Sequence, residues 1–144
     1  MKFQSIFIPS FVIPTCALLV GTIAALPAES ATLEFNRDVR PILAENCFQC
    51  HGPDSASRKG DLRLDKRDAA VEAGAIVPGN PKTSELVNRI FSADADEVMP
   101  PAEAHKDLKP AQREVLKRWI AEGAEYQPHW SFIAPQRPVV PPVK

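Results

Sequence analysis

The pentapeptide Cys47-Phe48-Gln49-Cys50-His51 holds the residues of this chain whose types and spacing indicate chemistry most clearly. Two thiols separated by two residues can add to the two vinyl groups on one edge of a porphyrin. The residue after the second thiol is then placed so that its imidazole reaches the iron. The pentapeptide therefore predicts one covalently attached haem c, bound through Cys47 and Cys50, with His51 as an axial ligand.

Other uses of a Cys-x-x-Cys pair fit the sequence less well. A redox-active pair would begin a helix that follows a strand, whereas this pair follows a predicted helix. A structural zinc site needs four ligands, and besides the two thiols only His51, His105 and His129 remain, at spacings unlike those of compact zinc modules. A disulfide between cysteines separated by only two residues would close too small a loop to stabilise a fold. Haem attachment is the preferred interpretation.

Met99 is the predicted second axial ligand of the iron. It is the only methionine outside the N-terminal segment, and it lies in a charged loop, 92–109, that gives an apolar side chain little to pack against. The following Pro100 and Pro101 would stiffen that loop and keep the thioether sulfur presented to iron. His105 is the alternative ligand, and the choice matters because methionine ligation raises the reduction potential relative to two histidines. We expect His129, beside Trp130, to pack or to lie in the C-terminal exit segment, residues 128–144.

The N-terminal segment 1–28 predicts a secretory signal peptide. After Lys2 it contains no charge up to Ala28, and its apolar core from Cys16 to Leu26 is followed by small residues where a signal peptidase could cut. An uncleaved membrane anchor is the alternative, since about 20 apolar residues span a bilayer. Either interpretation predicts an exported protein, periplasmic or in the cell envelope, with membrane contact only if the segment is uncleaved.

The composition of the chain is that of an ordinary globular domain. Of its 144 residues, 24% are charged and 44% hydrophobic, and the formal net charge is −1 with acidic and basic residues interspersed. Because no basic patch is present, nucleic-acid binding is not expected. No Ser-His-Asp set or carboxylate pair is placed to support hydrolysis, so the chain alone is not expected to be an enzyme.

Apolar periodicity predicts an all-α domain over residues 33–127, and together with the pentapeptide it indicates a small cytochrome c-like domain with the haem in its core. Four helices are expected, and the first and last of them should pack against each other. They run over 35–46 with Asn36 as N-cap, from a capping Asp65 to Gly74, from Asn80-Pro81 to near Phe91, and from Pro110 to Glu122 with Lys109 in place of a capping Ser or Thr. Residues 128–144 are rich in proline and predict an extended linker or tail.

Several of these segments together resemble the planctomycete-type cytochrome c domain: residues 35–54, 61–65, 76–79, 97–101 and 117–124. The resemblance covers about residues 34–133. It implies thioether bonds at Cys47 and Cys50, His51 as the proximal ligand and Met99 as the distal ligand. Lys109 departs from the pattern without touching these positions. Such domains usually open much longer exported proteins, so the resemblance implies that this chain is the product of a truncated gene, a fragment or a stand-alone version.

The expected function is single-electron transfer to a redox partner protein or to a C-terminal domain absent from this chain. One alternative is a haem-based sensing or binding module whose sixth iron position is open or filled by a histidine. Another is a structural N-terminal module of a longer protein. Only the ligand set of the iron distinguishes the first two.

Overall fold

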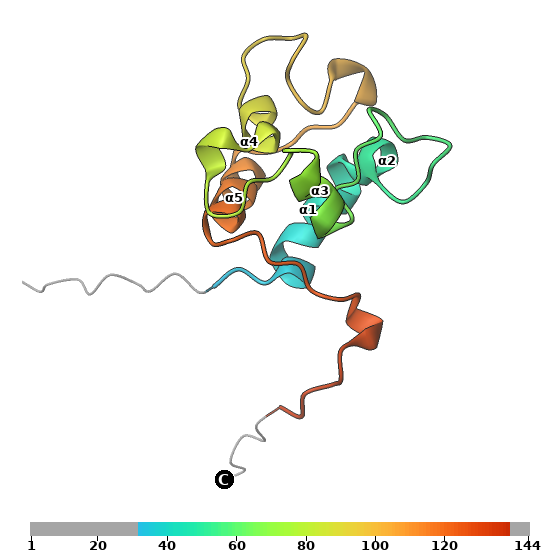
Figure 1. Cartoon of the computed structure of the whole chain (residues 1–144), viewed down its shortest axis with the longest axis vertical. Helices are drawn as coiled ribbons and strands as arrows, with labels where there is room; N and C mark the ends of the chain where they lie inside the picture. The colour runs from blue at the N-terminus through green and yellow to red at the C-terminus, as the bar shows by residue number, and fades with distance from the viewer. Residues whose placement is uncertain (1–31, 139–144) are drawn as a thin grey trace, which may run out of the picture. The chain divides into compact units, whose positions relative to one another are not determined.

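The computed structural model describes residues 32–138. The predicted signal peptide over 1–28 lies outside the described residues, as do residues 139–144 of the predicted tail. Within 32–138 the chain is helical and contains no strand, which confirms the prediction of an all-α fold (Figure 1). No helix in this part of the chain is long and apolar enough to span a membrane.

Short helices alternate with ordered loops along the described chain (Figure 1). Five are α-helical, one is a π-helical turn (η1) and three are 3₁₀ turns (η2 to η4) within residues 32–138. In chain order they are η1 (Phe35–Val39), α1 (Arg40–Asn46), α2 (Phe48–His51), α3 (Arg67–Glu72), η2 (Pro81–Thr83), α4 (Glu85–Ile90), η3 (Ala102–Ala104), α5 (Pro110–Ala121) and η4 (Trp130–Phe132).

The first predicted helix is present, but its start differs from the prediction. It begins as η1 at Phe35 and continues as α1, and its N-cap is Glu34, whose backbone N–H donates to Oδ2 of Asp38 at 2.8 Å. The prediction of Asn36 as N-cap is therefore wrong. Asn36 lies inside η1, and its side-chain amide donates to the carbonyl of Pro128 at 2.7 Å. The Asn36 side chain, which the sequence pattern predicted to cap the helix locally, instead hydrogen-bonds to a residue distant in the sequence.

The two middle helices also begin later than predicted. Asp65 forms an ion pair with Arg63 and does not cap α3, whose N-cap is Lys66. Asn80 precedes only the 3₁₀ turn η2, and α4 begins after Ser84. The Ser84 hydroxyl is fully buried, accepts from the N–H of Val77 at 2.9 Å and donates to the carbonyl of Asn80 at 2.9 Å. Because a buried hydroxyl needs partners, these bonds interrupt the predicted helix at Ser84.

The last predicted helix is confirmed as α5. It begins at Pro110, and Oε1 of Gln112 accepts from the backbone N–H of Lys109 at 2.9 Å, so the helix start is satisfied without a capping Ser or Thr. Leu116, Trp119 and Ile120 form its buried face. The helix stops before Gly123, whose φ of +106° suits glycine.

An aromatic cluster joins the first and last helices. The ring of Phe35 stacks on Tyr126 with centroids 4.3 Å apart, and Trp119 lies 5.7 Å from Phe35 and 5.2 Å from Tyr126. The predicted packing of these two helices is thus found at η1 and α5. The hydroxyl of Tyr126 donates to the carbonyl of Leu64 at 2.9 Å, which ties the cluster to the loop that follows α2.

The exit segment after this cluster is only partly extended. It contains one 3₁₀ turn, η4, whose Trp130 and Phe132 side chains are exposed. From residue 134 to residue 138 the described chain has no regular secondary structure.

Candidate haem site

A cavity of about 330 Å³ lies beside α2. Cofactor pockets in proteins commonly fall between about 300 and 1,000 Å³. All four predicted site residues line this cavity. Its wall comprises Asn46, Cys47, Cys50, His51, Gly60, Leu62, Leu64, Ala75, Glu85, Leu86, Arg89, Ile90, Met99, Pro100, Pro101 and Ala104. The wall is therefore mainly apolar and is assembled from segments distant in the sequence.

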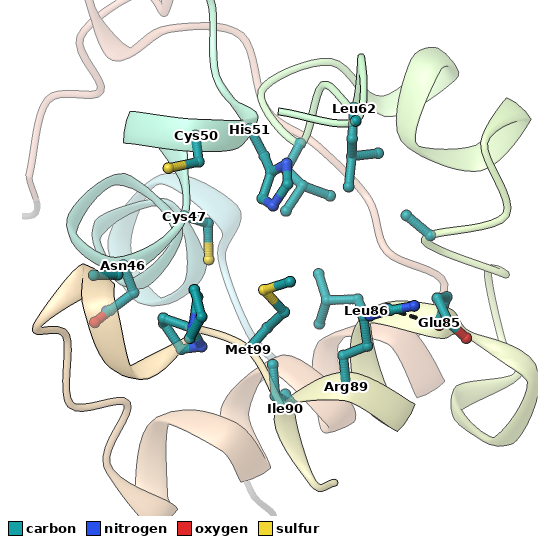
Figure 2. A pocket seen from close by; sticks show the side chains of 16 residues that line it. Asn46, Cys47, Cys50, His51, Leu62, Glu85, Leu86, Arg89, Ile90 and Met99 are labelled. Atoms are coloured by element: carbon teal, nitrogen blue, oxygen red, sulfur yellow. Dashed lines mark hydrogen bonds and ion pairs between the residues drawn. The ribbon is translucent and has the colours of Figure 1, made fainter. Parts of the chain in front are cut away.

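The two predicted axial ligands approach the cavity from different elements. Figure 2 shows the His51 imidazole and the Met99 thioether pointing into the cavity from opposite sides, with Cys47 and Cys50 next to His51. This is the arrangement that a flat macrocycle with one nitrogen and one sulfur axial ligand requires.

The turn between α1 and α2 presents the pentapeptide. The N–H of Cys47 donates to the carbonyl of Leu43 at 2.8 Å, and the N–H groups of Cys50 and His51 both donate to the carbonyl of Cys47, at 3.1 and 2.8 Å. This tight turn brings both thiols and the imidazole to the cavity. The thiols are not joined in a disulfide, and burial raises the pKa of the Cys47 thiol to about 12, so it is protonated at neutral pH.

His51 has a partner for its second ring nitrogen. Nδ1 lies 3.2 Å from the carbonyl oxygen of Lys59, so a proton on Nδ1 donates to that oxygen and leaves the Nε2 lone pair for a metal. Burial lowers the pKa of His51, which favours the neutral imidazole that binds metals. Sequence analysis missed Lys59, because a backbone acceptor has no side-chain signature.

The loop after α2 is held to the pentapeptide by backbone hydrogen bonds. The N–H of Lys59 donates to the carbonyl of Cys50 at 2.7 Å, and the N–H of Leu64 donates to the carbonyl of His51 at 2.8 Å. The Arg58 guanidinium donates from Nε to the carbonyl of Gly52 at 3.1 Å. These contacts fix the position of the Lys59 carbonyl and therefore the orientation of the imidazole.

The Met99 loop is anchored to the end of α4. The N–H of Met99 donates to the carbonyl of Arg89 at 3.1 Å, and the N–H of Val98 donates to the carbonyl of Asp94 at 2.9 Å. Pro100 and Pro101 continue the loop along the cavity wall. The stiff presentation expected of Met99 thus rests on backbone bonds as well as on the prolines.

The other two histidines lie away from the cavity wall. His105 is exposed, has a φ of +50° and is not a lining residue. His129 accepts at Nδ1 from the N–H of Ser131 at 3.3 Å and lies 5.3 Å from the Trp130 ring, so it packs in the exit segment. Within residues 32–138 no three His, Cys, Asp or Glu side chains gather in a group that could hold a metal ion, so the zinc alternative has no counterpart there.

The residues present fit haem c. A mainly apolar cavity of about 330 Å³ suits the faces of a porphyrin, two unpaired thiols suit its vinyl groups, and one imidazole nitrogen and one thioether sulfur suit its iron. The thiols and the imidazole come from a single turn, as the spacing of the pentapeptide predicts.

Comparison with known families agrees with this geometry. Residues 47–103 match the family model described as planctomycete cytochrome C, from the first thiol to just beyond Met99. Neither a curated protein nor a solved structure matches the chain. The match indicates haem c binding. Residues 47–103 are therefore similar to the planctomycete cytochrome C family, which confirms the resemblance predicted from the sequence motifs.

Proposed function

We propose that this chain is an electron-transfer domain that holds one haem c covalently through Cys47 and Cys50, with His51 and Met99 as axial ligands. One observation carries the proposal: the imidazole and the thioether point into one mainly apolar cavity from opposite sides, beside two unpaired thiols (Figure 2). The exposed position of His105, away from the cavity wall, favours Met99 over the histidine alternative.

Each residue of the site has a defined task in this proposal. The two thiols form thioether bonds and fix one edge of the porphyrin against α2. The Lys59 carbonyl accepts from Nδ1 of His51 and holds Nε2 toward the iron. A bound haem supplies an iron that exchanges one electron between its ferric and ferrous states. With both axial positions filled, the protein has little to rearrange on each exchange.

The apolar cavity wall favours the ferrous state of the iron, which carries less charge than the ferric state. Leu62, Leu64, Leu86 and Ile90 line the cavity and make its wall mainly apolar. An apolar surrounding and a thioether ligand both raise the reduction potential of a haem. We therefore expect a higher potential than that of a haem with two histidine ligands.

The proposal includes an exported location, periplasmic or in the cell envelope. The N-terminal segment, which is uncharged from Phe3 to Ala28, supports it, because such a segment is typical of a secretory signal. The partner is a redox protein or a C-terminal domain, and the chain acts as an electron carrier and not as an enzyme. The match to a cytochrome c family supports this carrier function.

Covalent attachment and axial ligation can be tested on protein that is exported to a bacterial periplasm containing the machinery that attaches haem to cysteines. We expect haem to stay on the chain after extraction with acidic organic solvent. The ferric protein should show a sulfur-to-iron charge-transfer band that disappears in Met99→Ala and persists in the matched control His105→Ala. Extractable haem, or a high-spin ferric spectrum with ready binding of small ligands, would overturn the proposal and favour a sensing module.

A further inference from the structure

We propose that Arg89 binds a haem propionate at the side of the cavity away from the two cysteines. The inference rests on the proposed function and extends it to the charged edge of the porphyrin. It starts from one feature of the cavity wall, which is a guanidinium in a mainly apolar lining.

Arg89 lies near the C-terminal end of α4 and is partly exposed. Figure 2 shows Arg89 and Glu85 on the side of the cavity away from Cys47 and Cys50. The backbone of Arg89 also accepts from the N–H of Met99 at 3.1 Å. One residue of α4 thus holds the Met99 loop through its carbonyl and places a permanent positive charge at the cavity.

The chemistry of the porphyrin explains why a cation is needed there. Its two vinyl groups and its two propionates lie on opposite edges. Thioether bonds to Cys47 and Cys50 would hold the vinyl edge against α2, so the carboxylates extend toward α4. A carboxylate in an apolar wall is costly unless it is paired. A guanidinium offers several N–H donors in a planar fork that matches a carboxylate.

Arg89 is the lining residue suited to this task among residues 32–138. The titratable side chains of the wall are Cys47, Cys50, His51, Glu85 and Arg89, and only the guanidinium carries a permanent positive charge. Two thiols and an imidazole are committed to attachment and ligation in the proposed function. Glu85 is itself anionic and would repel a propionate.

Glu85 holds the Arg89 guanidinium in place and leaves some of the guanidinium N–H donors available. Nε of Arg89 donates to Oε1 of Glu85 at 2.8 Å, one helical turn earlier on α4. The remaining N–H groups of a guanidinium can reach a second carboxylate. Arg89 would therefore bridge Glu85 and the propionate, and Glu85 acts as a positioning residue for it.

The experiment compares Arg89→Gln and Arg89→Lys with the matched control Arg118→Gln in the haem-loaded protein. Arg118 on α5 belongs to a similar i,i+4 ion pair with Glu122, the C-cap residue of that helix, at 2.6 Å, and does not line the cavity. Two readouts are used: the propionate bending band in the resonance Raman spectrum and the midpoint reduction potential. A positive charge beside the haem stabilises the ferrous state, so its removal lowers the potential.

We expect Arg89→Gln to shift the propionate band and to lower the midpoint potential. Arg89→Lys should restore most of the potential but not the wild-type band, because an ammonium lacks the bidentate fork. Arg118→Gln should match wild type in both readouts. Equal readouts for Arg89→Gln and Arg118→Gln would overturn the inference. A lower potential of Arg89→Gln with an unchanged propionate band would overturn it too, because Arg89 would then act through its charge without contacting the propionate.

The failure of this inference is distinguishable from failure of the proposed function. If wild-type protein keeps its haem through acidic extraction and shows the sulfur-to-iron band, only the Arg89 variants decide the inference. If wild type loses its haem in that extraction, the proposed function falls and the propionate contact falls with it.

Discussion

At the residue scale, Gly52 ends α2 at a position where any side chain would clash with the preceding helical turn. The residue is buried, and a Cβ built there would lie 2.1 Å from the carbonyl oxygen of Phe48 and 2.9 Å from its carbonyl carbon. The obstacle is backbone, which cannot move without displacing the turn that carries the thiols. We expect Gly52→Ala to lower the free energy of unfolding by about 1–3 kcal/mol, the usual cost of overpacking.

Urea unfolding of the haem-loaded protein, followed by far-UV circular dichroism, measures this loss. The control is Ser55→Ala in the same loop, where the side chain is exposed and the change should stay within about 0.5 kcal/mol. A Gly52→Ala variant as stable as the control would show that α2 relaxes around the added methyl group.

The site residues that could be predicted are those whose side chains carry the chemistry. The spacing of Cys47, Cys50 and His51 identifies the attachment turn, and the unusual setting of Met99 in a charged loop identifies it as a candidate ligand. All four line the same cavity. The carbonyl of Lys59 could not be predicted, because every residue has a carbonyl and only the folded loop brings this one to Nδ1 of His51.

At the scale of the helices, the presence of a helix was easier to predict than the residue at which it begins. Apolar periodicity located three of the four predicted segments because burial of one face determines where a helix forms, whereas the segment from Asp65 to Gly74 was located by its end signals and the short α2 was not predicted. The caps were mispredicted where a polar side chain found a tertiary or neighbouring partner. Asn36 bonds to Pro128 and Asp65 pairs with Arg63. Ser84 was missed because its role depends on a buried contact with Val77, seven residues earlier.

The start of η1 makes stability depend on pH through Asp38. The pKa of this carboxyl falls to about 2, first because the Arg37 side chain hydrogen-bonds to it and then because it accepts from the N–H of Glu34. A carboxyl whose pKa is lower in the folded state stabilises the fold above its unfolded value, near 4, and loses that contribution as the pH falls toward 2.

We expect Asp38→Asn to cost about 1 kcal/mol at pH 7, a value reduced for solvent screening because Arg37 is half-exposed. The difference from wild type should shrink as the pH falls from about 4 to about 2. Urea unfolding at several pH values measures it, with Glu103→Gln on exposed η3 as the control. A difference that stayed constant with pH would mean that Asp38 acts through its shape and not through its charge.

At the scale of the described chain, the cavity wall joins parts that periodicity cannot relate to one another. The wall draws on α2, on the loop around Leu62, on α4 and on the Met99 loop, whereas the aromatic cluster of Phe35, Trp119 and Tyr126 packs η1 against α5. The two loops have no apolar period, and backbone hydrogen bonds set their shape. Apart from Met99 and its two prolines, the residues that these loops contribute to the wall were therefore not predictable from the sequence.

A domain of this size depends on what fills its cavity. Without a filler, the mainly apolar wall of this cavity of about 330 Å³ would stay in contact with water, at a cost of about 25 cal/mol per Å² of apolar surface. A whole domain is stable by only about 5–15 kcal/mol. We therefore expect the double variant Cys47→Ser, Cys50→Ser, which cannot form thioether bonds, to lack cooperative unfolding and to show poorly dispersed amide resonances.

Urea titration and amide NMR spectra of the double variant test this expectation, with haem-loaded His105→Ala as a folded control. His105 is exposed and away from the cavity wall, so its removal should leave a sharp unfolding transition. A double variant with native-like dispersion and a sharp transition would mean that the walls of the cavity close on themselves. The loop contacts at Lys59 and Met99 would then hold the ligands in place before haem arrives, and the haem would bind to a preformed site.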